Sequence, residues 1–456
     1  HTVNGLELVG QNKFNGAGEY RPIPAIYFAN LYSLFSTNVF FYHLLQLVIH
    51  SSNTILLFFL FKHFFSKYIA LFLSLLFLVH PIQVESVSYI ASSGNPLFFL
   101  FGITALLMSF KTNSNVKRLL IISTLLLLSF LTKETGVLFL IIIILFRFLF
   151  KMKNFMYFLM SGIASLIIYL FIRFIIGGVY LSHPDIVPIA RLDLIDRLVN
   201  IPAIVFYYLK TFFFPAQLNI EQLWVVKNID FNSFYLPLLI DIVFFIIVGI
   251  LGTYVYKKSK ANFTKFIFFL LWFLMGLALH LQIFPLNMTV ADRWFYFTMV
   301  GLLGIIGIGI EPVTFSSKKL RFISYVIAIL IIALLSVRTI ERNTNWVSAL
   351  VLYNHDRQVH TNYSIENRLG GEYLALKQYD KALEHFVTST KMFPTQISLG
   401  NVAFTYESVG NVKKAKEYYL KAFDTHHYTS IPQDHVKGIY LRLASVLFIT
   451  DDFNAA

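Results

Sequence analysis

Polar side chains gather where one apolar run of this sequence ends, in the stretch His80-Pro81-Ile82-Gln83-Val84-Glu85. An imidazole, an amide and a carboxyl group so close together offer donors and acceptors for a polar head group. His80 and Glu85 are also residue types that transfer protons in general acid–base catalysis. The competing interpretation is structural, with the same residues capping a helix and forming a loop.

Three cations stand in other short polar stretches, at Arg21, Lys133 and Arg293. An arginine guanidinium binds a phosphate through two parallel hydrogen bonds, and a lysine binds it as a point charge. These three residues are therefore candidates to hold a phosphate group. Glu134 and Asp292 stand next to two of them, so internal salt bridges remain the alternative.

A polar stripe also crosses the apolar run 39–61, where His43, Gln46, His50 and Asn53 follow one another at spacings of 3, 4 and 3. These spacings place all four side chains on one face of a helix. Polar groups inside a membrane either bind a substrate or join neighbouring helices by hydrogen bonds. Both roles stay open for this stripe.

The elements that position these residues must be membrane helices. Of the 456 residues, 57% are hydrophobic and 13% charged, with a mean hydropathy of +0.67. A water-soluble protein cannot bury that much apolar surface, whereas a bilayer can solvate it. The absence of cysteine excludes disulfides, zinc–thiolate sites and cysteine nucleophiles. No motif for binding a nucleotide, a metal or a nucleic acid is visible.

Ten apolar runs approach the length that spans a bilayer, about 20 residues. We expect them near 39–61, 66–80, 96–110, 118–132, 136–150, 154–176, 235–256, 263–284, 295–311 and 319–339.

The loops between these runs carry an asymmetric charge. One set of alternate loops has 15 basic and no acidic residues, and the other set has 5 basic and 8 acidic residues. By the positive-inside rule the first set is cytoplasmic, so all the candidate side chains in loops lie on the outer face. The shorter run 200–214 must then enter and leave on one side, as an interfacial or re-entrant helix.

The last part of the chain repeats itself with a period of 33 residues. The matching pairs are Tyr373 and Tyr406, Ala382 and Ala415, Phe386 and Tyr419, and Ser389 and Ala422. Small and large residues alternating at this period are typical of tetratricopeptide repeats, which stack antiparallel helices. A third unit begins near Lys437, and the last span places all the repeats outside.

Several separated motifs together resemble one known family. In chain order they are Tyr20-Arg21-Pro22-Ile23, Tyr42-His43-Leu44 with His50 and Asn53, His80-Pro81-Ile82-Gln83-Val84-Glu85-Ser86-Val87, Lys133-Glu134-Thr135-Gly136, Ala291-Asp292-Arg293 with Tyr296, and Arg342-Asn343-Thr344-Asn345-Trp346. The ordered set resembles the transmembrane and tetratricopeptide-repeat-containing O-mannosyltransferases and their bacterial relatives, in the glycosyltransferase C superfamily.

The resemblance implies an all-α fold, a polytopic helical bundle followed by a tetratricopeptide-repeat solenoid. It divides the chain into 1–38, the remainder of a first extracytoplasmic loop; 39–340, the bundle of about ten helices with the interfacial helix; 341–362, a connector; and 363–456, the repeats. A first span and an acidic catalytic pair are expected before His1, which leaves Glu19 and Glu85 as secondary catalytic candidates.

The resemblance also implies a reaction, the transfer of a sugar, expected to be mannose, from a polyprenyl-phosphate carrier to a protein hydroxyl on the extracytoplasmic face. The repeats would present the acceptor protein. The expected substrate or lipid-phosphate contacts are Arg21, His80, Gln83, Lys133, Glu134, Arg293 and Tyr296. A divalent cation stays open as a cofactor, no metal ligands are assigned, and no nucleic acid is expected as a partner.

Composition rich in Phe, Ile, Lys and Asn favours a bacterial plasma membrane, with the endoplasmic reticulum as the alternative. Two other functions also stay open. One is a non-catalytic membrane scaffold whose repeats bind peptides, and the other is a transporter of lipid-linked glycans.

Overall fold

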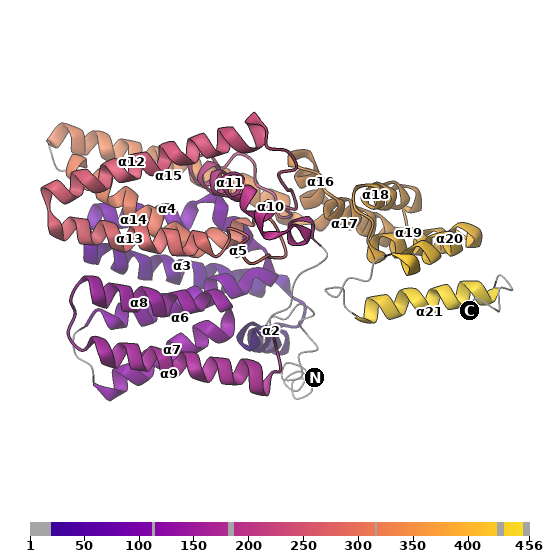
Figure 1. Cartoon of the computed structure of the whole chain (residues 1–456), viewed down its shortest axis with the longest axis horizontal. Helices are drawn as coiled ribbons and strands as arrows, with labels where there is room; N and C mark the ends of the chain where they lie inside the picture. The colour runs from indigo at the N-terminus through magenta and orange to yellow at the C-terminus, as the bar shows by residue number, and fades with distance from the viewer. Residues whose placement is uncertain (1–19, 112–114, 181–186, 315–316, 426–432, 450–456) are drawn as a thin grey trace.

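The computed structural model describes residues 20–111, 115–180, 187–314, 317–425 and 433–449, and these ranges are helical with no β-strand. A bundle of long helices runs in one direction, and an arm of shorter helices extends from one end of it (Figure 1). The helices of the bundle are α2 (Pro22–Phe35), α3 (Val39–Phe64), α4 (Lys67–Val79), α5 (Val84–Ser88), α6 (Gly94–Ser109), α7 (Val116–Thr132), α8 (Val137–Leu149), α9 (Phe155–Phe171), α10 (Leu194–Val199), α11 (Ile201–Phe213), α12 (Leu236–Lys258), α13 (Lys260–Ala278), α14 (Phe295–Thr314) and α15 (Lys318–Thr344).

A helix lies in each of the ten apolar runs, but not all of these helices are long. Seven are long and apolar enough to cross a membrane, or eight if α4 and α5, which meet at a 50° bend, form one span. The bend follows from the sequence, because Pro81 cannot continue the hydrogen-bonding of α4. The fold class predicted from the sequence, a polytopic helical membrane bundle, is confirmed.

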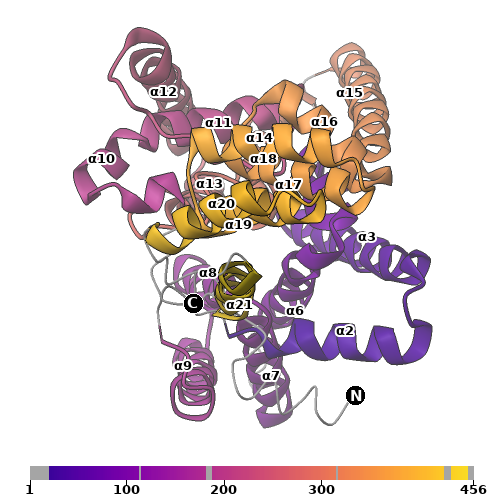
Figure 2. The same cartoon turned by 90° about the vertical axis from the view of Figure 1, so that its right-hand side faces the viewer.

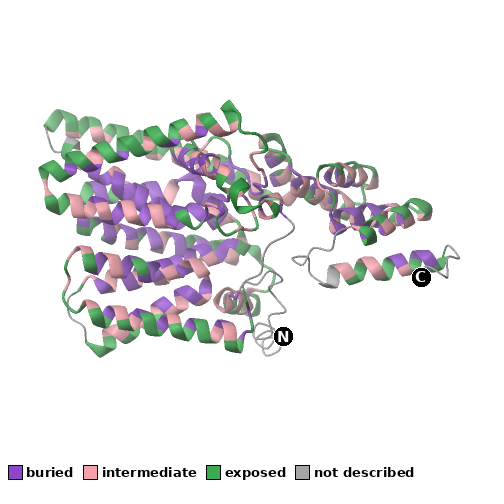
Figure 3. Cartoon of the chain, in the orientation of Figure 1, coloured by how far each residue is buried: buried purple, intermediate pink, exposed green. Residues whose placement is uncertain are grey.

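The burial pattern shows that the bundle is built for a lipid solvent. In the most apolar window of α14, 78% of the residues are buried, whereas in that of α15 none is buried. Green, exposed stretches run along α12 and α15 although these helices are strongly apolar (Figure 3). Apolar side chains on an outer surface of this size are stable when lipid tails surround them.

The core of the bundle is aromatic and tightly packed. Phe99, Phe139, Trp272 and Tyr296 are fully buried there, with the rings of Phe139 and Trp272 packed edge to face. Helices α13 and α14 meet at Gly301, where a Cβ atom would lie 2.3 Å from the backbone nitrogen of Phe273. Only glycine allows this approach, so the α13–α14 contact is backbone against backbone.

The loops rich in lysine and arginine lie at the end of the bundle away from the arm (Figure 1). Lys265 donates to the Phe64 carbonyl over 3.0 Å, and the Ser66 amide donates to Glu311 over 2.9 Å. Arg147 donates to the Ser109 carbonyl over 2.6 Å. These bonds cross between neighbouring helix ends and hold that face of the bundle together.

The arm consists of paired helices after α15 and α16 (Ala349–Val359). They are α17 (Tyr363–Ala375), α18 (Tyr379–Met392), α19 (Gln396–Ser408), α20 (Val412–Asp424) and α21 (Gln433–Ile449). The predicted repeat positions Ala382, Phe386, Ala415 and Tyr419 are all fully buried between them. The predicted tetratricopeptide repeats are therefore confirmed, and α16 occupies much of the range 341–362 that we expected as a connector.

A segment after α11 attaches the arm to the bundle. The Asn219 side chain donates to the carbonyls of Asp356 and His360, and the Ile220 amide donates to the Asp356 carboxylate over 2.8 Å. Glu221 accepts from Arg368 over 2.8 Å. Helix α11, predicted as interfacial, thus lies at the end of the bundle that carries the arm (Figure 1).

Candidate functional site

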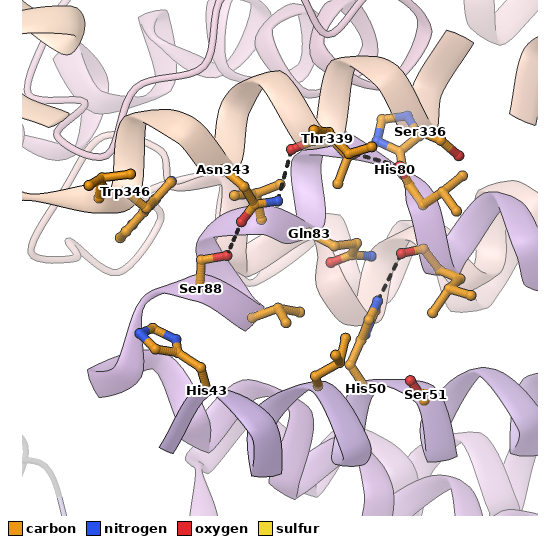
Figure 4. A pocket seen from close by; sticks show the side chains of 17 residues that line it. His43, His50, Ser51, His80, Gln83, Ser88, Ser336, Thr339, Asn343 and Trp346 are labelled. Atoms are coloured by element: carbon orange, nitrogen blue, oxygen red, sulfur yellow. Dashed lines mark hydrogen bonds between the residues drawn. The ribbon is translucent and has the colours of Figure 1, made fainter. Parts of the chain in front are cut away.

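A groove of about 630 Å³ lies at the arm end of the bundle, with α3 on one side, α15 on the other and the α4–α5 bend at its back (Figure 4). Leu47 and Ile340 are exposed at its mouth. It is called the α3–α15 groove below. Its polar lining comes from His43, His50, Ser51, His80, Gln83, Ser88, Ser336, Thr339, Asn343 and Trp346.

The polar stripe on α3 divides between the groove and the bundle. His50 reaches both, because its Nε2 donates to the Leu78 carbonyl over 3.1 Å and its Nδ1 accepts from the Tyr296 hydroxyl over 2.8 Å. Asn53 donates to the same hydroxyl over 3.0 Å. Gln46 donates to the Tyr89 and Ile90 carbonyls, just after α5, and does not line the groove. Tyr296, a predicted substrate contact, is fully buried inside this network.

A second polar stripe lines the other wall, with Ser336, Thr339 and Asn343 on α15 and Trp346 in the short 3-10 turn that follows this helix. The Thr339 hydroxyl donates to the Val79 carbonyl over 2.6 Å. The Asn343 oxygen accepts from Ser88 over 2.5 Å, as Figure 4 shows. Two helices far apart in the sequence thus present polar side chains to one space.

His80 stands at the back of the groove with both ring nitrogens engaged. Its Nε2 donates to the Phe212 carbonyl over 2.9 Å, and its Nδ1 accepts from the Ile82 amide over 3.2 Å. The ring also stacks on Phe212 at 5.1 Å. This residue caps the bend and joins it to α11, which is the structural alternative left open by the sequence.

Glu85, just after Gln83, forms a buried ion pair with Arg293. The carboxylate accepts from the Arg293 guanidinium and, over 2.9 Å, from the Arg293 amide. Only 4% of the Glu85 side chain and 14% of the Arg293 side chain are exposed. Asp292, the residue before Arg293, accepts instead from the Tyr207 hydroxyl over 2.5 Å. Glu85 therefore orients the guanidinium and is poorly placed to act as a free base.

A second charged cluster lies around Glu134, in the turn between α7 and α8. Glu134 accepts from Arg21 over 2.9 Å and from Arg173 over 3.0 Å. Burial raises the pKa of Glu134, but the two guanidiniums outweigh burial and hold that pKa below its usual value. Lys133, its neighbour, donates to Asn95 over 2.5 Å.

The helices near the two clusters can be followed when the bundle is viewed from the arm end. In Figure 2, α15 lies at the upper right with α3 below it, α7 and α9 lie at the bottom, and α2 runs from beside α7 to below α3. The structure therefore groups the predicted contacts His80, Gln83, Arg293 and Tyr296 near the α4–α5 bend, and Arg21, Lys133 and Glu134 near α7. Glu19 lies outside the described residues. Within the described ranges, no group of three or more His, Asp or Glu side chains could hold a metal ion.

Comparison with known proteins identifies relatives over most of the chain. Protein O-mannosyl-transferase TMTC3 of Homo sapiens is 24% identical over 92% of this chain, and TMTC3 of Mus musculus is 23% identical over 92%. Protein O-mannosyl-transferase F38B6.6 of Caenorhabditis elegans is 26% identical over 78%. The chain is a relative of the transmembrane and tetratricopeptide-repeat-containing O-mannosyltransferases.

This relationship confirms the resemblance seen in the motifs. A tetratricopeptide repeat family model matches residues 398–424, which correspond to α19 and α20. The chain spans about half the length of the curated O-mannosyltransferases it matches, with 51% of the human protein covered. No solved structure matches it.

Three groove residues of this O-mannosyltransferase relative were not selected from the sequence. Thr339, Asn343 and Trp346 stand in or beside the last family motif, and with Ser336 they follow the spacing 3, 4 and 3. That is the spacing of the stripe on α3, so the same rule of helical faces identifies both.

Proposed function

We propose that this protein is a membrane glycosyltransferase that moves mannose from a polyprenyl-phosphate carrier to a protein hydroxyl on the extracytoplasmic face. The supporting observation is the position of the α3–α15 groove. It opens between two membrane helices at the end of the bundle that carries the repeats. A lipid-linked donor diffusing in the bilayer and an acceptor held by the repeats can meet there, and the relatives are named protein O-mannosyl-transferases.

In this reaction the acceptor oxygen forms a bond to the anomeric carbon of the sugar. The bond from that carbon to the phosphate oxygen breaks, and its electron pair leaves with the lipid phosphate. The hydroxyl proton passes to a carboxylate base. Positively charged donors placed at the phosphate stabilise the charge that develops on it.

Arg293 is the cation we assign to the phosphate. Its partner Glu85 stands on α5, whose residues Val84, Val87 and Ser88 form the back wall of the groove. Because Glu85 fixes the guanidinium, Arg293 is already ordered before the donor binds. Arg21 and Lys133, on the α7 side, are the second candidates for this role.

The test is transfer of radiolabelled mannose from a polyprenyl-phosphate donor to Ser- and Thr-containing peptides, with the full-length protein in nanodiscs. We expect alkali-labile label on the peptides, and less of it for Arg293→Gln. Peptide binding without transfer would instead identify a scaffold. Passage of the intact labelled lipid across the bilayer of a proteoliposome, without transfer, would identify a transporter.

A further inference from the structure

The lining of the α3–α15 groove is polar but carries no charge of its own. Among its 17 described lining residues there is no Asp, Glu, Lys or Arg. The polar groups are hydroxyls, amides, imidazoles and an indole, all of which exchange hydrogen bonds with neutral ligands. The groove therefore matches a group rich in hydroxyls better than it matches a bare phosphate.

Most of these polar groups already have protein partners, which explains how they are tolerated at bilayer depth. His50, His80, Thr339 and Asn343 bond to neighbouring carbonyls, rings or side chains as described above. Their hydrogen bonds close the walls of the groove. They leave little capacity for a ligand.

Gln83 is the exception at the back of the groove. Its side chain is 2% exposed, and its Oε1 has no hydrogen-bond partner among the described residues. Its Nε2 faces the Met299 sulfur at 3.2 Å, a weak acceptor. A buried amide without a strong partner costs free energy, so its retention needs a reason. Because the amide can turn over, it can either donate to or accept from a hydroxyl in the groove.

Trp346 is the second exception, on the α15 wall at the other end of the groove (Figure 4). Its Nε1 is buried and has no acceptor within the part of the chain that the structure describes. Tryptophan combines a flat apolar face with one donor, a combination that suits the alternating apolar and polar faces of a sugar ring. His43, on α3, faces this wall across the groove mouth.

We propose that the α3–α15 groove is a sugar-binding subsite in which Gln83 and Trp346 hydrogen-bond the hydroxyls of a lipid-linked sugar. The identification of this sugar with the one that the protein transfers rests on the proposed function. The groove distinguishes sugar-bearing lipid from the bare lipid phosphate that remains after transfer. Product therefore leaves the site more readily than donor.

The experiment measures binding of two lipids to the full-length protein in nanodiscs, mannosyl-phosphate polyprenol and polyprenyl phosphate of the same length. Gln83→Met keeps the side-chain length and removes the amide. Losing one hydrogen bond to a sugar hydroxyl lowers affinity about threefold to tenfold. We expect that loss for the mannosylated lipid alone, and a smaller loss in the same direction for Trp346→Phe.

Gln46→Met is the matched control, since Gln46 is also a buried glutamine but does not line the groove. It should lower thermal stability without changing the ratio of the two affinities. If Gln83→Met leaves that ratio unchanged while the native protein prefers the mannosylated lipid, the sugar subsite is wrong and the proposed function stands. If the native protein binds neither lipid, both are wrong.

Discussion

Two grooves of nearly equal size open on this bundle, and their linings differ. The α3–α15 groove has a volume of about 630 Å³, and a groove between α11, α12 and α14 has one of about 620 Å³. The second is called the α11–α14 groove, and among the described residues that line it Lys210 alone has a polar side chain. Polar side chains at bilayer depth are costly. The concentration of polar side chains in the α3–α15 groove, and not the volume of either groove, therefore supports the α3–α15 groove as the candidate functional site.

The largest expected difference is in the rate of mannose transfer, when a bulky side chain fills one groove or the other. Ser336→Trp adds an indole to the α3–α15 groove, and Ile306→Trp adds one to the α11–α14 groove. If the donor enters the first groove, Ser336→Trp should lower mannose transfer about tenfold or more, equivalent to at least about 1.4 kcal/mol of lost binding. Ile306→Trp should change transfer less than about twofold, within the scatter typical of a surface substitution.

Transfer rates of the two variants at equal protein and donor concentration provide the measurement. A larger loss of mannose transfer for Ile306→Trp than for Ser336→Trp would indicate that the donor binds in the α11–α14 groove instead.

The next largest expected difference is in stability, when the charge associated with each groove is removed. Glu85→Gln leaves the buried Arg293 guanidinium without its counterion, and breaking such a pair lowers the free energy of unfolding by about 3–5 kcal/mol. Lys210→Gln changes the one charge of the α11–α14 groove, which is exposed, and should change stability by less than about 0.5 kcal/mol. Thermal unfolding in detergent compares the two. Equal stabilities would show that the Glu85–Arg293 pair does not support the groove.

A smaller effect, on the stability of the junction between α15 and α16, should appear at low pH. This junction joins the α3–α15 groove to the repeats. Arg342 donates to the fully buried Asp356 carboxylate over 2.8 Å. Burial raises the pKa of Asp356, but hydrogen bonds from His355 and Arg342 outweigh burial and lower it. Because the pKa of Asp356 is lower in the folded state than in the unfolded chain, the ionised carboxylate stabilises the junction fully at pH values above the unfolded pKa, about 3.9. This stabilisation is lost as the pH falls through the folded-state pKa of Asp356.

Hydrogen exchange of α16 and of the last turn of α15, corrected for the intrinsic rate, should therefore accelerate below about pH 4. Exchange in α12, beside the α11–α14 groove, should not follow this profile. Asp356→Asn is the control, and it should remove the pH dependence. An identical acid profile in α12 would indicate global unfolding and not release of the junction.

Much of the fold could be predicted from the sequence, because long apolar runs allow few structures in a bilayer. The run expected at 39–61 forms helix Val39–Phe64, and the run at 319–339 lies within Lys318–Thr344. The charge of the loops predicted that the basic loops lie together, and in the structure they lie at one end of the bundle. The side of the membrane that each end faces stays a prediction.

The contacts of the site were harder to predict, because neighbours in sequence suggested the wrong pairs. The sequence left open salt bridges between Lys133 and Glu134 and between Asp292 and Arg293, yet adjacent residues of a helical segment point in different directions. Glu134 pairs with Arg21, 113 residues away, and Arg293 pairs with Glu85, 208 residues away. Only the packing of helices brings such partners together.

We propose that the sugar of the donor lies in the neutral polar lining of the α3–α15 groove. Photolabelling with a mannosyl-phosphate polyprenol that carries a diazirine on the sugar, followed by peptide mapping, tests it directly. We expect label on α3, on the bend between α4 and α5, and on the end of α15 with the turn after it, close to His43, Gln83 and Trp346. Label concentrated on α11, α12 and α14, or on the α7 side around Arg21, would contradict it.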